Sequence, residues 1–224
     1  MKKINKFWKL FNKDSNHKTV TEENSETPQA TTESPQPTKE EEPEHSENTQ
    51  NTKDAKMNNG KAKIYNLIIV DESGSMSHLR EATLSGINET ISTIRSAQEE
   101  FVTTQEHTLT LVTFDSGSNR PYVRTMIDNQ PISEVKDFKD YMPNGCTPFY
   151  DAMGQSLTHL HDRIKDDKDA TAVVTVLTDG LENASREWDA AGLRRLIEQL
   201  KSEGWSFAYM GSAHNVKEVT DLLS

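Results

Sequence analysis

Apolar residues in the second part of the chain gather in short segments at regular intervals. Residues 62–70, 170–177 and 205–210 are rich in aliphatic and β-branched residues, a composition typical of strands buried on both faces of a parallel sheet. Residues 107–114 and 120–127 are separated by the turn-forming sequence DSGSN, which predicts an antiparallel hairpin. The pattern therefore predicts five strands.

Apolar residues at helical spacing occupy the intervals between these strands. They predict helices over about 79–101 and 148–164, a third that contains Leu193–Leu200 and ends at Gly204, and a last one from residue 214 or 215 to the end. Strands that alternate with helices favour an α/β fold in which a doubly wound, largely parallel central sheet has helices on both faces.

The residues before this domain have a different composition. Residues 14–60 contain 11 acidic residues and 4 lysines. Their only apolar residues are Val20, Ala30, Ala55 and Met57. Such a stretch cannot bury enough apolar surface to offset chain entropy, so we predict a disordered acidic linker. Residues 61–224 suffice for one domain. The formal net charge of −11 argues against a nucleic-acid partner, because a nucleic-acid binder normally presents a basic face.

Residues 1–13 form a basic segment with five lysines and no acidic residue. In a helix, Ile4, Phe7, Trp8 and Phe11 would form one apolar stripe. Two interpretations stay open: a short helix that contacts a membrane surface or a partner's groove, or a disordered tail. Lysines interrupt any signal-peptide core, and the single cysteine, Cys146, suits a reducing compartment. We therefore expect a cytoplasmic protein, located at the inner membrane face if residues 1–13 bind lipid.

Hydroxyl and carboxylate side chains follow the predicted buried strands. Two motifs come directly after strands, and a third lies in the loop before a helix. Because the carboxyl ends of parallel strands meet at one edge of the sheet, these side chains are expected to converge. An all-oxygen set suits a hard cation such as Mg²⁺ or Mn²⁺. The candidate ligands are Asp71, Ser73, Ser75, Thr147 and Asp179.

These motifs resemble a known site. The sequences DESGS at 71–75, GCTP around Thr147 and LTDG around Asp179 are similar, in the same order, to the metal-ion-dependent adhesion site of von Willebrand factor A-type domains, and most of all to intracellular bacterial members. The resemblance covers about residues 62–224 and implies one antiparallel edge strand. It also implies direct metal contacts from Ser73, Ser75 and Thr147, with Asp71 and Asp179 acting directly or through water.

The same resemblance implies a protein-binding module, not an enzyme, in which an Asp or Glu of a partner protein completes the metal shell. Two alternatives stay open. One is a Mg²⁺-dependent phosphoryl-transfer or hydrolytic enzyme, although the sequence has no P-loop and no D-x-D pair. The other is a scaffold that binds no metal, in which the motifs are only helix caps and a turn. Tyr150, Glu182, Asn183 and Arg186 are expected to line the rim.

Overall fold

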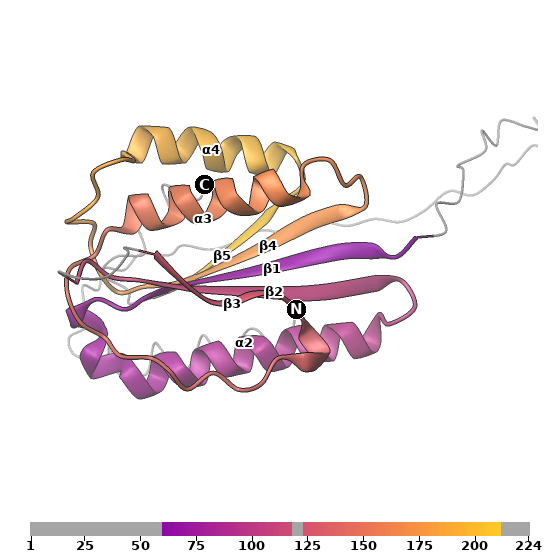
Figure 1. Cartoon of the computed structure of the whole chain (residues 1–224), viewed down its shortest axis with the longest axis horizontal. Coiled ribbons are helices and arrows are strands. Elements are labelled where there is room, and N and C mark those ends of the chain that lie inside the picture. Colours follow the sequence, from indigo (N-terminus) through magenta and orange to yellow (C-terminus); the bar gives the residue numbers. More distant parts are fainter. Residues whose placement is uncertain (1–59, 118–122, 212–224) are drawn as a thin grey trace, which may run out of the picture. The chain divides into compact units, whose positions relative to one another are not determined.

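A computed structural model of the chain describes residues 60–117 and 123–211 (Figure 1). The basic segment 1–13, the linker 14–60 apart from Gly60, and the last predicted helix lie outside these residues. None of the helices within the described ranges is both long and apolar enough to span a membrane.

One sheet organises the described residues. Its strands are β1 (Ala62–Asp71), β2 (Gln105–Phe114), β3 (Val123–Pro131), β4 (Ala170–Leu177) and β5 (Ser206–Met210), in the order β3-β2-β1-β4-β5. β1 pairs in parallel with β2 and β4, and β4 pairs in parallel with β5. β2 and β3 are antiparallel. The predicted doubly wound α/β fold with one antiparallel edge strand is therefore confirmed.

Helices cover both faces of this sheet, as Figure 1 shows. α2 (Arg80–Glu100) packs on one face, and α3 (Phe149–Ile164) and α4 (Ala190–Ser202) pack on the other. Two short 3₁₀ helices, η1 (Gly74–Leu79) and η2 (Ile132–Glu134), complete the elements of the described part. The helices begin and end close to the predicted positions. The sequence did not predict η1, a 3₁₀ helix that separates β1 from α2.

The core has two layers because β1 alternates its side chains between the two faces of the sheet. Leu67 and Ile69 pack with α3 and α4, whereas Ile68 and Val70 pack with α2. All four side chains are almost fully buried. Helices cover both faces of β1 at Leu67–Val70, which explains why these four consecutive residues are all apolar.

The edge strand β3 differs from its prediction. It runs to Pro131, although the sequence predicted an end at Ile127. The last residues, DNQP, are polar and of low strand propensity. They still pair with β2 through an irregular register, in which Asn129 adopts a positive φ of 45° and donates its N–H to Thr110 Oγ1. An edge strand tolerates such a bulge and such a composition.

Candidate metal site

The candidate ligands lie where the winding of the sheet reverses. From β1 the chain proceeds outward to β2 and β3, and it later returns to add β4 and β5 on the other side of β1. Asp71 is the last residue of β1, and Asp179 lies two residues beyond the end of β4. The crevice at the carboxyl ends of two such strands is the usual ligand site of doubly wound sheets.

The segment that follows β1 folds its side chains back toward this edge. The backbone N–H of Ser73 donates to Asp71 Oδ1 at 2.8 Å, and the Ser73 and Ser75 hydroxyl oxygens are 3.1 Å apart. The Ser75 hydroxyl also donates to Asp179 Oδ1 at 3.3 Å. A chain of contacts therefore joins four of the five candidate residues, with the Ser73 backbone as one link. Asp71 and Ser73 are buried, whereas Ser75 is exposed.

Thr147 lies close to the Asp71 carboxylate beside Gly180. A Cβ atom built on Gly180 would lie 2.7 Å from Asp71 Oδ2 and 2.9 Å from Thr147 Oγ1. Both oxygens thus border a space that only glycine leaves open at this position. The backbone N–H of Thr147 donates to Asn183 Oδ1 at 2.9 Å, which fixes the threonine over the loop after β4.

The geometry does not support simple helix caps at these residues. Ser73 and Pro148 are the residues that precede η1 and α3, and neither makes a side-chain capping hydrogen bond. The hydroxyl of Ser73 contacts Ser75, and Thr147 lies one residue before the cap position of α3.

Burial raises the pKa of the Asp71 carboxyl above its ordinary value of 3.8. Hydrogen bonds from Thr178 and Ser73 oppose this effect in part, and the nearby negative charge of Asp179 adds to it. A buried carboxylate beside a second carboxylate is a place where a cation would relieve both desolvation and repulsion.

The donor set fits a hard divalent cation. It consists of two carboxylates and three hydroxyls: Asp71 and Thr147 oxygens lie beside Gly180, and Ser75 contacts both Ser73 and Asp179. Mg²⁺ and Mn²⁺ prefer such oxygen ligands. Within residues 60–117 and 123–211, no group of three or more His, Cys, Asp or Glu side chains could hold a metal ion. The candidate set is not a group of that kind, because it has only two carboxylates and its other three ligands are serine and threonine hydroxyls.

Polar contacts that the sequence did not reveal hold the loop after β4. The carboxylate of Asp151, which is fully buried, accepts the backbone N–H groups of Arg186, Glu187 and Trp188 at 2.8–2.9 Å. Glu182 accepts the backbone N–H groups of Tyr150, Ala184 and Ser185. The carboxylate of Glu182, expected at the rim, therefore binds the backbone of this loop and of α3.

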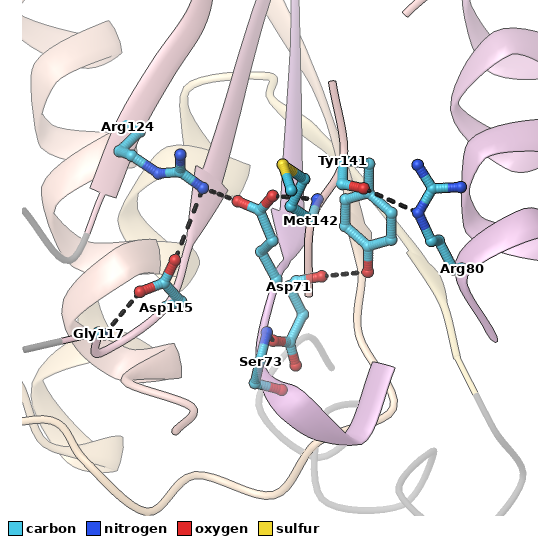
Figure 2. A network of polar contacts seen from close by, with 9 residues as sticks. Asp71, Ser73, Arg80, Asp115, Gly117, Arg124, Tyr141 and Met142 are labelled. Carbon is cyan, nitrogen blue, oxygen red and sulfur yellow. Dashed lines mark hydrogen bonds and ion pairs between the residues drawn. The ribbon is translucent and has the colours of Figure 1, made fainter. Parts of the chain in front are cut away.

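A second group of contacts, shown in Figure 2, lies beside the candidate ligands. The Tyr141 hydroxyl donates to the backbone oxygen of Asp71 at 2.7 Å, and Arg80 Nε donates to the Tyr141 carbonyl at 3.1 Å. Next to them, the partly buried Arg124 pairs with the buried carboxylates of Glu72 and Asp115. No signal in a single sequence pairs residues so distant along the chain.

Comparison with known proteins supports the fold. No family model and no curated protein matched the sequence. Among solved structures, the pilus adhesin SpaC from Lactobacillus rhamnosus GG, in its open conformation, superposes with a TM-score of 0.56 at 13% identity. The match covers 74% of this chain and 27% of SpaC, so the chain spans about a quarter of that protein.

Two further structures are similar at lower scores. Manganese-loaded TRAP protein from Plasmodium vivax gives a TM-score of 0.46 at 19% identity, covering 70% of this chain and 62% of TRAP. The VWA domain of SpRpn10 gives 0.43 at 14% identity, covering 71% and 82%. These two superpositions are too weak to carry an argument. Together, the strand order and the SpaC match give the described residues a von Willebrand factor A-like fold.

Proposed function

We propose that this chain is a metal-dependent protein-binding module. Asp71, Ser73, Ser75, Thr147 and Asp179 hold one divalent cation, Mg²⁺ or Mn²⁺, at the carboxyl edge of the sheet. The observation that supports this proposal is a set of contacts at the carboxyl edge of a von Willebrand factor A-like fold. Hydrogen bonds link Asp71, Ser73, Ser75 and Asp179, and oxygens of Asp71 and Thr147 lie beside Gly180.

The charge of the site indicates the chemistry of the partner. A cation bound there would supply an open coordination position to a carboxylate of the partner protein. The two aspartates balance a divalent charge, and the serine and threonine hydroxyls add none, so the site does not repel an incoming Asp or Glu. Mg²⁺ keeps waters readily, which leaves a position that a partner's oxygen can take.

Calorimetric titration of the full chain with MgCl₂ and MnCl₂ tests the metal part of the proposal. We expect one divalent ion to bind, and Ser75→Ala to weaken this binding. Ser77→Ala is the matched control, because Ser77 is exposed on the same 3₁₀ turn and is not a candidate ligand. The absence of divalent binding at millimolar concentrations would overturn the proposal.

A displayed library of random peptides tests the partner chemistry. Peptides captured by the full chain in Mg²⁺ and released by chelator should contain an Asp or Glu. A second library without acidic residues should yield no chelator-released peptides. Selection of the same peptides by the Asp179→Ala variant would place recognition on another surface.

One observation favours the alternative of a metal-dependent hydrolase or phosphoryl transferase. His78 Nε2 lies 3.8 Å from Asp179 Oδ2, so an imidazole stands beside the candidate site. An imidazole can act as a general base. His78 is nevertheless largely exposed and belongs to a short 3₁₀ turn, so nothing in the structure holds it against a substrate. Turnover of generic phosphoesters that is lost in His78→Ala would establish the enzyme in place of the binding module.

A further inference from the structure

Glu72 lies between two candidate metal ligands, Asp71 and Ser73, one residue beyond the end of β1. It is 1% exposed. Its carboxylate accepts the backbone N–H of Met142 at 2.6 Å, and its carbonyl accepts the N–H of Asn144 at 2.7 Å. Glu72 therefore joins the first ligand segment to the segment that leads to Thr147.

A third hydrogen bond continues this pairing toward the site. The N–H of Gly74 donates to the carbonyl of Gly145 at 2.9 Å. Gly145 has a φ of +87°, a conformation that favours glycine, and an added Cβ would lie 3.2 Å from the backbone nitrogen of Gly117. Hydrogen bonds thus hold segments 72–74 and 142–145 side by side. The first contains Ser73 and leads to Ser75, and the second leads to Thr147.

Arg124, on the edge strand β3, holds the Glu72 carboxylate. Arg124 Nη2 donates to Glu72 Oε2, and the same nitrogen lies 3.6 Å from Asp115 Oδ2 (Figure 2). The Glu72 and Asp115 side chains are each 2% exposed. Removing Arg124 would leave the buried Glu72 carboxylate without this ion-pair partner, which is strongly disfavoured.

We propose that Glu72 and Arg124 are positioning residues of the candidate metal site. The Glu72 carboxylate, held by Arg124, sets the spacing between the Asp71–Ser75 segment and Thr147. Mg²⁺ demands near-ideal octahedral geometry, so this spacing controls how well the two segments can share one ion. The inference rests on the proposed function, since it assigns these residues a role in the same site.

The double variant Glu72→Gln/Arg124→Met tests this role. It removes one negative and one positive charge together, so the net charge beside the site is unchanged. Asp128→Asn/Arg163→Met is the matched control: it also removes one ion pair, Arg163 Nη1 to Asp128 Oδ1 at 2.7 Å, and it too involves β3. Val123, the first residue of β3, pairs with Phe114 at the carboxyl end of β2, near the site. Asp128 lies five residues further along β3 and is therefore more distant from the site.

Two measurements on the full chain separate positioning from general stability. Calorimetry should show Mg²⁺ affinity about tenfold weaker in Glu72→Gln/Arg124→Met and unchanged in the control, as for other residues that orient metal ligands. Hydrogen exchange in chelator should show faster exchange at the amides of residues 142–147 in the first variant alone. Arg124→Lys keeps the charge, so its Mg²⁺ affinity and exchange rates should lie between those of the wild type and the double variant. It replaces the double variant in both measurements if the latter folds poorly.

The outcomes distinguish the two proposals. Wild-type exchange at residues 142–147 in the double variant would overturn the positioning role whatever the metal result. A variant that is less stable but binds Mg²⁺ with wild-type affinity would also overturn it. A wild-type chain that binds no divalent ion would overturn the proposed function and the positioning role together, while the exchange data would still show whether Glu72 and Arg124 hold the loop.

Discussion

The Thr178 hydroxyl donates a 2.6 Å hydrogen bond to Asp71 Oδ2, which joins the carboxyl ends of two neighbouring parallel strands. Asp71 Oδ1 is occupied by the N–H of Ser73. Both oxygens of a buried carboxylate are thus engaged without a cationic side chain among these contacts. Burial still raises the pKa of Asp71, so the hydrogen bonds offset only part of the desolvation cost.

Asp71→Asn should leave the metal-free domain at least as stable as the wild type at neutral pH. The pKa of Asp71 is higher in the folded than in the unfolded state, so folded chains bind the proton more tightly, and stability falls as pH rises above the ordinary value of 3.8. An asparagine removes that loss and can still accept the Ser73 N–H. Thermal unfolding in chelator from pH 4 to pH 8 measures the difference.

The same variant should fail to respond to Mg²⁺. A bound metal would raise the unfolding temperature of the wild type by mass action, and a variant without the Asp71 carboxylate would lose that gain. Asp128→Asn is the control for a surface carboxylate. An equal rise in unfolding temperature with Mg²⁺ in wild type and Asp71→Asn would show that Asp71 is not a ligand.

Gly180→Ala should weaken metal binding and leave the fold intact. The added methyl group would lie 2.7 Å from Asp71 Oδ2 and 2.9 Å from Thr147 Oγ1, so these two oxygens must move apart. Gly60→Ala is the control, because Gly60 precedes β1 at the end of the strand opposite to the site, and its Cβ would meet its nearest atom, Asp169 Oδ2, at 3.5 Å. Calorimetric titration with MgCl₂ should show a loss of at least about tenfold for Gly180→Ala alone. Equal affinities for the two variants would contradict this assignment.

Asp151→Ala should destabilise the domain by about 3 kcal/mol, because three backbone N–H groups of the loop before α4 lose their buried acceptor. Urea unfolding measures the change. Asp189→Ala is the comparison: Asp189 accepts the N–H of Gly192 at 2.7 Å as an exposed cap of α4, so about 1 kcal/mol is expected. A smaller effect for Asp151 than for Asp189 would show that solvent satisfies the loop.

Strands and helices were predictable because apolar periodicity reports directly on burial. β1 ends in the apolar run Leu67–Val70, and β4 is mostly aliphatic; each strand is followed by one of the motifs. The contacts that support the site were not predictable. Glu72 occupies a position between Asp71 and Ser73 that carries no signal of its own, and its partner Arg124 is 52 residues away. Which polar side chains meet depends on register and on loop paths that composition does not encode.

The end of β3 shows the same limit for secondary structure. Residues 128–131 have the composition of a turn, yet they pair with β2 because the neighbouring strand offers hydrogen-bonding groups at that edge. Tertiary context overrides local propensity there.

The last prediction concerns residues 1–13, which lie outside the described residues. Ile4, Phe7, Trp8 and Phe11 on one helical stripe would bury apolar area in a lipid surface, and each lysine would add about 1 kcal/mol near anionic headgroups. Co-sedimentation of the full chain with anionic vesicles should fall when residues 1–13 are deleted, and for the intact chain it should fall with added salt. Neutral vesicles are the control. Trp8 should contribute to a blue shift of the emission spectrum on binding, so Trp8→Phe should reduce that shift. If the truncated and intact chains sediment equally, the segment does not anchor the protein to lipid. The remaining interpretations are then a helix that binds a partner's groove and a disordered tail.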